Sequence, residues 1–170
     1  MTLSQIIAIL ELTPGTLRGL MLHATEEDFT WQPSPQRWSF AMVLAHLAEV
    51  EKQGFMDRFR DIEAEDGAFL PAYDQLALFR TGKKFDAQRE YDSFARQRAS
   101  TLAWLRARPE GIGSRTGRHE TFGLLSFDQL LHEFAFHDLG HIRQIMELYR
   151  THALYPHMSA AFQEYYQVNP

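Results

Sequence analysis

The sequence SFDQLLHEFAFHDLGHIRQIMELYR, residues 126–150, decides the fold that we predict for this chain. Ser126 and Gln129 form the Ser-x-x-Gln pattern of a capping box, which marks the first turn of a helix. Apolar residues and two histidines then recur at steps of three and four, the period of one helix face. They are Leu130, Phe134, His137, His141, Ile145 and Leu148. We therefore predict a long helix whose buried stripe carries two histidines.

These two histidines are spaced for metal binding. His137 and His141 are four residues apart, so their imidazoles lie one above the other on the same face of the helix. A borderline metal ion can take two nitrogen ligands from one helix in this way. The candidate for a third ligand is His46, which falls on the apolar side of a second predicted helix. Burial of three inward histidines without partners would be costly, which favours a metal site over three core histidines.

Three carboxylates are candidates for a role beside these histidines. Glu49 lies about one turn after His46 and Glu133 one turn before His137, so helical phase favours both. Each could be a fourth ligand, a general base or a hydrogen-bond partner of an imidazole N–H. Asp138 points about a quarter-turn away from His137. The predicted catalytic residues are therefore Glu49 and Glu133.

Three further segments have the periodicity of helices. The first covers residues 2–24, and we expect it to break or restart at Thr13-Pro14, because proline is favoured at the first position of a helix. The second begins after the cap residue Ser39 and ends near residue 61 or 63. The third covers residues 86–108. A short terminal helix is expected around Phe162.

The connecting segments 66–85 and 110–125 read as irregular loops, because they contain glycine and proline breakers and almost no strand pattern. The first is long enough to cover a site. With four long helices, we predict an all-α fold, a four-helix bundle whose metal site lies between the second and fourth helices. A length of 170 residues fits a single domain, residues 1–170.

Some residues are expected to have structural roles. Arg98 lies on an apolar stripe, and we expect it to extend its head group toward solvent. Trp31 is expected to pack rather than line a pocket, and Tyr73 is a weaker candidate for a pocket residue. His119 is expected to be solvated in its loop. The remaining histidines are expected to be hydrogen-bonded core residues: His23, His132, His152 and His157.

Composition narrows the function. The net charge of −5 argues against a nucleic-acid partner. No apolar run approaches the roughly 20 residues needed to cross a bilayer, so no membrane role is expected. The N-terminus lacks the basic region of a signal peptide, which makes the cytoplasm the expected location. The count of cysteines is zero, so any metal is held by nitrogen and oxygen, and any reacting thiol comes from a small molecule.

The motifs together resemble a known family. Trp38-Ser39 and Leu44-Ala45-His46-Leu47, followed about a hundred residues later by His137-Asp138-x-x-His141-x-x-Gln144, are similar to the DinB-like superfamily, also called the YfiT-like metal-dependent hydrolases. The Thr13-Pro14 pair and the order of the helices fit as well. The resemblance thus covers nearly the whole chain.

The resemblance implies a divalent ion held by His46, His137 and His141. Nickel or zinc is the expected metal, with iron or manganese as alternatives, and a homodimer is the expected assembly. Activities in the superfamily include transfer of low-molecular-weight thiols to electrophiles and thiol-dependent isomerisation.

We therefore expect a metal-dependent enzyme of the thiol S-transferase or hydrolase type that acts on a small molecule. The alternatives are a non-catalytic metal-binding or small-ligand-binding bundle of a stress response, or a relic site on a protein that works through its surface. His137-Asp138-x-x-His141 also resembles the His-Glu-x-x-His motif of zinc proteases, but no further protease signature is present.

Overall fold

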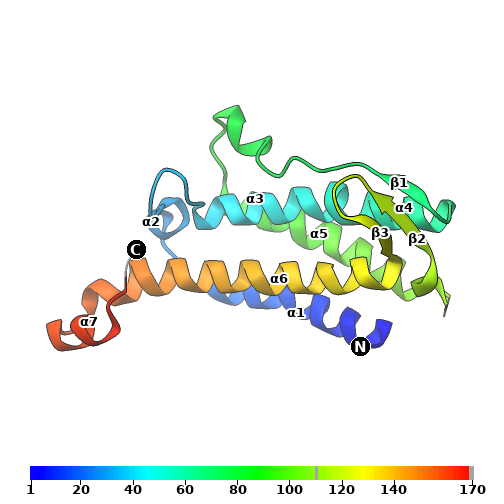
Figure 1. Ribbon diagram of the computed structural model, residues 1–170. Helices are drawn as coiled ribbons and strands as arrows, with labels where there is room; N and C mark the ends of the chain where they lie inside the picture. Colours follow the sequence, from blue (N-terminus) through cyan, green and yellow to red (C-terminus); the bar gives the residue numbers. More distant parts are fainter. Residues whose placement is uncertain (110, 169–170) are drawn as a thin grey trace.

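Four long helical segments lie side by side in the computed structural model, which describes residues 1–109 and 111–168 (Figure 1). They are α1 (Leu3–Met21), the continuous run of α3 (Phe40–Val50), the π-helical η1 (Glu51–Met56) and α4 (Asp57–Ala64), then α5 (Ala87–Arg106) and α6 (Phe127–Tyr149). The four-helix bundle expected from the sequence is confirmed. Glu110, the first residue of the second expected loop, lies outside the described residues, as do residues 169–170 of the expected domain.

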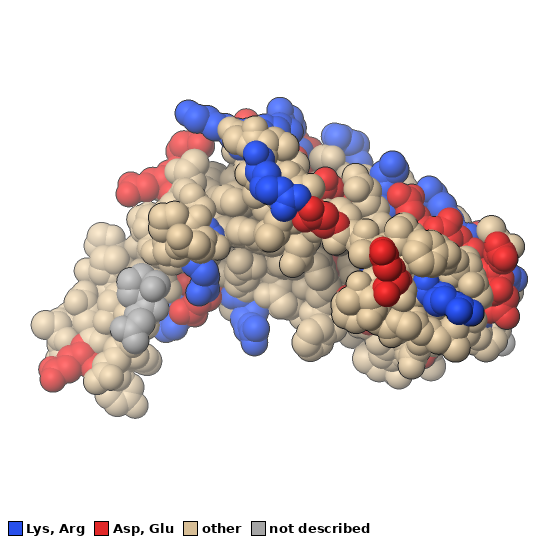
Figure 2. Space-filling view, turned by 45° about the horizontal axis from the view of Figure 1, so that its top comes forward, with Lys and Arg blue, Asp and Glu red and all other residues tan. Residues whose placement is uncertain are grey.

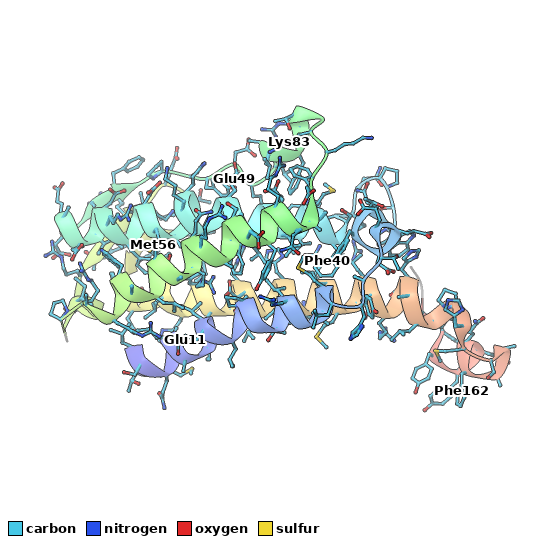
Figure 3. The ribbon with its side chains drawn as sticks, turned by 180° about the vertical axis from the view of Figure 1, so that it is seen from behind. Glu11, Phe40, Glu49, Met56, Lys83 and Phe162 are labelled. Carbon is cyan, nitrogen blue, oxygen red and sulfur yellow. The ribbon has the colours of Figure 1, made fainter. Side chains whose placement is uncertain are left out.

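Shorter elements connect and extend the bundle. They are α2 (Glu26–Thr30), η2 (Leu78–Thr81), η3 (Ile112–Ser114), η4 (Arg150–Leu154), η5 (Tyr155–His157) and α7 (Ala160–Tyr166). The expected terminal helix is α7, which projects beyond the end of the bundle, with Phe162 far from the core (Figures 1 and 3). None of the described helices has the length and apolar character needed to cross a membrane.

The long helices begin at side-chain caps. The Thr2 hydroxyl accepts the backbone N–H of Gln5, and the Ser126 hydroxyl accepts that of Gln129. Ser39 and Asp86 cap α3 and α5 in the same way, each accepting the N–H three residues on. These side chains satisfy donors that a helix start leaves free, which is why the capping pattern located the helices correctly.

The expected break at Thr13-Pro14 is wrong, because α1 continues through Pro14 to Met21. Proline has no N–H, so it cannot donate to the carbonyl of Leu10 one turn earlier. The Nη1 of Arg98, on α5, donates to that carbonyl at 3.0 Å. A long-range hydrogen bond therefore replaces the missing helical one.

A small sheet corrects the expectation that segments 66–85 and 110–125 are irregular loops with almost no strand pattern. β1 (Ala68–Leu70) pairs in parallel with β2 (Thr116–His119), and β2 forms an antiparallel hairpin with β3 (Gly123–Ser126). The strands are three or four residues long, too short to show alternation. A side chain at Gly117 would meet Leu70 at 2.6 Å, so glycine is required for the close packing of this sheet. The hairpin crosses one end of α4 and α6 (Figure 1).

The core contains a polar layer between two apolar clusters. One cluster includes Leu10, Phe59 and Phe134, and the other includes Leu17 and Phe94. Along the chain, a buried polar residue separates the two on three of the helices: Thr13 on α1, Arg98 on α5 and Asp138 on α6. On the remaining segment the buried polar residue is Glu51, at the start of η1. The four helices thus meet at one buried polar contact.

Arg98 lies at the centre of this layer, and the residue is 0% exposed. Its guanidinium donates to both carboxylate oxygens of Glu51 at 2.8–3.1 Å and to those of Asp138 at 2.5 and 3.0 Å. The Thr13 hydroxyl also donates to Asp138, at 2.6 Å. The expectation that Arg98 reaches solvent is therefore wrong, because two buried carboxylates and a carbonyl hold it inside.

The charges of this cluster are unequal, since one cation faces two carboxylates. Burial alone would lower the pKa of Arg98, but Asp138 and Glu51 outweigh burial and raise it. Burial raises the pKa of Glu51 against the attraction of Arg98. The cluster therefore depends on Arg98, since its removal would leave two buried carboxylates unpaired.

Charges on the surface are distributed differently. Figure 2 shows acidic and basic side chains interspersed over the face that it presents, without a broad patch of either sign.

We predict that Arg98→Met lowers the free energy of unfolding by about 3–5 kcal/mol, because it leaves Glu51 and Asp138 without a cation. Urea denaturation at pH 7 measures this. Arg96→Met, at an exposed position of the same helix, is the matched control and should leave the stability unchanged. A fall no larger than that of the control would show that the buried cluster does not hold the helices together.

Candidate metal centre

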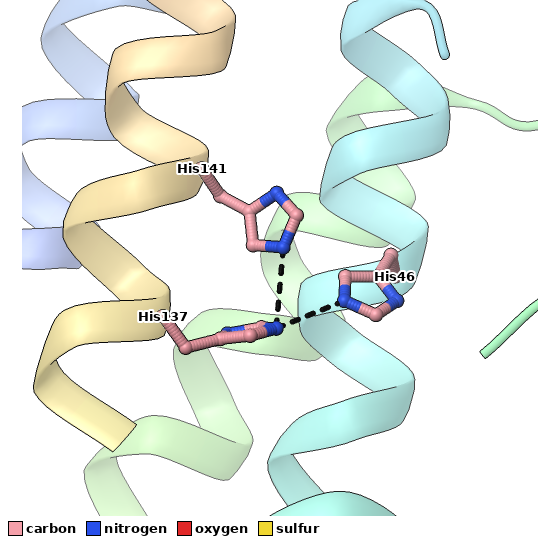
Figure 4. A group of neighbouring side chains, drawn as sticks. All are labelled: His46, His137 and His141. Carbon is pink, nitrogen blue, oxygen red and sulfur yellow. Dashed lines mark hydrogen bonds between the residues drawn. The ribbon is translucent and has the colours of Figure 1, made fainter. Parts of the chain in front are cut away.

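Three imidazoles converge between α3 and α6 (Figure 4). The Nε2 of His46 lies 3.1 Å from the Nε2 of His137, and the Nε2 of His141 lies 3.2 Å from the same atom. Ligand atoms from the three residues all lie within 4.8 Å of one another. His46 is 1% exposed, while His137 and His141 are partly exposed. The three histidines singled out in the sequence thus form one cluster with an accessible side.

Hydrogen bonds within the cluster leave these rings unsatisfied. A neutral imidazole has one N–H and one acceptor nitrogen. The Nε2 of His137 faces two other Nε2 atoms but carries either one proton or one lone pair, so it cannot make two good hydrogen bonds. The buried Nδ1 atoms of His46 and His137 have no partner among the described residues. A cation at the centre would accept a lone pair from each Nε2 and remove the conflict.

The distances fit a divalent ion. Zinc binds histidine nitrogen at about 2.0–2.1 Å, and two nitrogens in a tetrahedral arrangement at that range lie about 3.4 Å apart. The observed separations of 3.1 and 3.2 Å are slightly shorter. Three imidazoles suit zinc, nickel or iron rather than magnesium or calcium, which prefer oxygen. The residues present therefore fit the metal that the sequence suggested.

The electrostatic environment keeps the three rings neutral. Burial, and then the neighbouring histidines, lower the pKa of His46 to about 2. Burial and His141 lower the pKa of His137 to about 4. Burial also lowers the pKa of His141, against a hydrogen bond from its Nδ1 to the Oε1 of Gln144 at 2.9 Å. Neutral imidazole is the form that binds metal, so all three are ready to act as ligands at pH 7.

Gln144 orients one of these ligands, a role that the sequence analysis does not predict. Because its Oε1 can only accept, the Nδ1 of His141 carries the proton and the Nε2 of His141 presents a lone pair to the centre. The spacing in the sequence could have indicated this role, because Gln144 lies three residues after His141 on nearly the same face of the helix.

Aromatic rings cover the cluster. The ring of Trp38 lies 4.8 Å from that of His46 and 6.0 Å from that of His141. Phe79, from η2 in the 66–85 loop, packs on Trp38 at 4.5 Å between ring centroids. Phe55 meets the ring of His137 edge-on at 5.4 Å. The long loop thus reaches the site through Phe79, as expected of a segment that covers a site.

The three carboxylates have different environments. Glu49, labelled in Figure 3, lies one turn after His46 and accepts the hydroxyl of Tyr73 at 2.6 Å. Burial and Glu49 raise the pKa of Tyr73, which therefore stays protonated. Glu133 is exposed when the whole residue is considered. Partial burial of its carboxyl raises its pKa, although the positive charge of Arg58 acts in the opposite direction. Asp138 lies in the Arg98 cluster and points away from the histidines, as its helical phase indicated.

Several other expectations are corrected. His119 is buried, at 4% exposure, because it lies in β2 rather than in a solvated loop. His23 and His157 are exposed, so they are not core residues. Trp31 packs as expected, stacked on the half-buried His152 at 4.6 Å.

The fold and the histidine cluster together define a helical bundle with a candidate three-histidine metal centre. The profile of the DinB superfamily matches residues 9–145, a span that contains all three histidines. The chain belongs to the DinB superfamily.

Solved structures show the same fold. YfiT from Bacillus subtilis, described as a probable metal-dependent hydrolase with an unusual four-helix bundle topology, superposes with a TM-score of 0.79 and is 22% identical. That alignment covers 88% of this chain and 86% of YfiT. TT2238, a four-helix bundle protein, has a TM-score of 0.59 and is 21% identical over 85% of this chain and 98% of its own. No curated protein matches the chain.

We predict that the metal-free protein loses stability as the pH falls from 6.5 to 5. The folded-state pKa values of His46 and His137 are lowered to about 2 and about 4, so these rings take up protons only on unfolding. Each should lower the free energy of unfolding by up to about 1.4 kcal/mol per pH unit below its unfolded pKa of about 6.5. Urea denaturation in the presence of a chelator measures the slope.

His46→Gln should reduce this pH dependence, whereas His157→Gln, at an exposed position, should not. A wild-type stability that is flat across this range would contradict the burial of three neutral histidines.

Proposed function

We propose that this protein is a metal-dependent enzyme that acts on a small molecule, of the thiol S-transferase or hydrolase type, with His46, His137 and His141 as its metal ligands. The observation that carries the proposal is the convergence of three Nε2 atoms with no hydrogen-bond arrangement that satisfies them. Closed structural zinc sites usually have four protein ligands, whereas catalytic sites have three and leave a position open.

The chemistry that we propose follows from this open position. An ion held by three neutral histidines lowers the pKa of a water or thiol that binds to it, from 15.7 toward about 7 in the case of water. Since the protein has no cysteine, a reacting thiol must come from a small molecule. Hydrolysis and thiol transfer then differ in which nucleophile enters the site.

The chain's own residues have separate tasks in this proposal. Gln144 holds His141 in the tautomer that presents its Nε2, and Trp38 and Phe79 limit the access of water. Glu49 accepts the proton of the nucleophile, because it lies one turn from His46 and Tyr73 fixes its carboxylate. Glu133, one turn before His137, is the second candidate for proton transfer, and its raised pKa suits an acid–base role.

Nickel or zinc is the metal that we propose, because imidazole ligands suit these ions better than magnesium or calcium. The alternatives are iron, which also accepts imidazole, and manganese, which prefers oxygen ligands. The description of YfiT as a probable metal-dependent hydrolase supports the hydrolytic form of the proposal. The resemblance to the DinB-like superfamily supports the thiol-dependent form.

We expect about one divalent ion per chain in protein purified without a histidine tag, and its loss in His141→Ala, because two imidazoles alone hold an ion weakly. Elemental analysis measures the metal content. His132→Ala is the matched control, since His132 lies on the same helix with its Nδ1 at the carbonyl of Asp128. Absence of metal in wild type, even after reconstitution with nickel, zinc, iron and manganese, would rule out the metalloenzyme.

Turnover assays on the metal-loaded protein then distinguish an enzyme from a non-catalytic binding bundle. Glu49→Gln should lower turnover of a thiol-transfer or ester substrate at least about a hundredfold while it leaves the metal content unchanged. If no substrate of either type turns over, the non-catalytic binding bundle becomes the better account.

We also propose that the chain forms a homodimer through the outer face of α6. This face exposes Phe136 at 79%, Leu139 at 52% and Met146 at 53%. A groove of about 540 Å³ beside it is lined by Leu20, Ile142 and Leu154 in addition to Leu139 and Met146. Apolar faces of this kind commonly mark protein–protein contacts.

Leu139→Glu should therefore shift a dimer to a monomer in sedimentation velocity, whereas Phe69→Glu, at an exposed apolar position of β1, should not. A wild type that stays monomeric at about 100 μM, where a dimer with a micromolar Kd would be largely formed, would contradict the proposal.

A further inference from the structure

The C-terminal arm, residues 155–166, presents an aromatic face to solvent. The arm consists of η5 and α7, and none of the seven residues of α7, all of which the structure describes, is buried. Phe162, Tyr165 and Tyr166 are 60%, 78% and 54% exposed. Because they are three and four positions apart, their rings lie on one side of the helix. An apolar face of this kind on an ordered helix indicates contact with another surface.

Hydrogen bonds fix the position of the arm. The Nε2 of Gln163 lies 3.1–3.2 Å from the carbonyl oxygens of Tyr155, Pro156 and Met158. The Tyr155 hydroxyl in turn donates to the carbonyl of Gln163 at 2.9 Å. These contacts join α7 to η5 and leave the aromatic face free. In Figures 1 and 3 the arm turns away from the axis of α6, toward the side on which α1 lies. The arm is therefore an ordered element whose rings are held away from the core of their own bundle.

An apolar groove lies next to the arm, between α6 and the end of α1. This α6 groove has a volume of about 540 Å³, with Leu20 of α1 and Leu154 of η4 in its walls. Leu154 directly precedes the arm, so the groove ends where the arm begins. Most of the lining is apolar, and Arg143 and Arg150 add two guanidinium groups. Aromatic rings suit both features, because they fill apolar space and stack on guanidinium groups.

The area of the arm matches what a stable dimer needs. A covered Phe or Tyr side chain buries about 150–250 Å², so the exposed parts of the three rings offer roughly 300–500 Å² per arm. Two arms, each covering an equal area of groove, bury roughly 1,200–1,900 Å² in total, and a specific interface buries about 1,200–2,000 Å². A reciprocal pair of arms is therefore large enough to hold two chains together.

We propose that α7 of one chain docks in the α6 groove of a second copy, and that the second copy makes the same contact in return. The contact is reciprocal because a two-fold dimer uses the same patch on both subunits. A second copy fits because the arm and the groove adjoin on one chain, so a two-fold axis near the end of α6 places each arm over the other groove. This arm exchange rests on the homodimer proposed above, for which it names the segment that fills the groove.

Disulfide cross-linking tests the contact directly, because the chain has no cysteine of its own. Tyr165→Cys is mixed with an equal amount of a second variant that carries cysteine in the groove: Leu139→Cys, Ile142→Cys or Met146→Cys. After chain exchange and mild oxidation, at least one mixture should contain a disulfide between the arm of one chain and the groove of the other, identified by mass spectrometry of the linked peptides. Phe69→Cys, at 62% exposure on β1, is the matched control for the groove and should not link to the arm.

A variant with both cysteines, Tyr165→Cys and Met146→Cys, tests the other occupant of the groove. An intrachain disulfide in this variant, with no linked pair in any of the mixtures, would show that the arm closes over the groove of its own chain. That result would overturn the exchange.

Loss of the aromatic face should also weaken the dimer. Phe162→Ser combined with Tyr165→Ser should raise the dissociation constant at least about tenfold in sedimentation equilibrium, because truncation of an aromatic side chain at the centre of an interface commonly costs more than this factor. Phe122→Ser, at 68% exposure between β2 and β3, is the matched control and should leave the dissociation constant unchanged. Tyr165→Phe, which keeps the ring, should dimerise as wild type does.

The outcomes distinguish failure of the arm exchange from failure of the other proposals. A dimer that Leu139→Glu disrupts, but in which no groove position links to position 165 and the serine variant dimerises as wild type does, would overturn the exchange and leave the homodimer. A wild type that is monomeric at about 100 μM and forms no cross-link would overturn both. The metal content of the same samples tests the metal centre independently, because α7 contributes no ligand to it.

Discussion

The guanidinium of Arg98 is the contact on which the bundle depends. It joins α1, η1, α5 and α6 through the carbonyl of Leu10 and the carboxylates of Glu51 and Asp138. Buried ion pairs are often no better for stability than apolar packing, yet removal of one partner is strongly destabilising. The cluster therefore fixes how the helices are arranged more than how stable they are. It also allows α1 to continue through Pro14, because the carbonyl left without a helical donor is the one that Arg98 binds.

This contact also orients the candidate metal centre. Asp138 follows His137, and adjacent residues on a helix point about 100° apart. When Arg98 and Thr13 hold Asp138 in the core, α6 can no longer rotate about its axis, and His137 and His141 are directed toward His46 on α3. The aspartate of the His-Asp-x-x-His motif thus has a positioning role, which differs from that of the glutamate in the protease motif that it resembles. In the proposed function, proton transfer is assigned to Glu49 or Glu133 instead.

The helices and the histidine cluster could be predicted from the sequence because they depend on local patterns. Caps, three- and four-residue periodicity and the spacing of His137 and His141 act within one helix. The errors arose where a distant partner decides the outcome. The sequence around Arg98 does not show that Glu51 and Asp138 form ion pairs with it. The sequence around Pro14 does not show that Arg98 donates to the carbonyl that Pro14 leaves without a helical hydrogen bond. The strands of the hairpin are too short for their pattern to be read, so the burial of His119 was missed with them.

The proposed metal centre consists of one ion held by His46, His137 and His141 with an open position. X-ray absorption spectroscopy of the zinc-loaded protein measures its ligands. We expect three imidazole nitrogens at about 2.0–2.1 Å and at least one further ligand that does not come from the protein. In His46→Gln the imidazole count should fall. A spectrum with no imidazole, or with four protein ligands and no exchangeable one, would show that the three histidines do not form an open metal site.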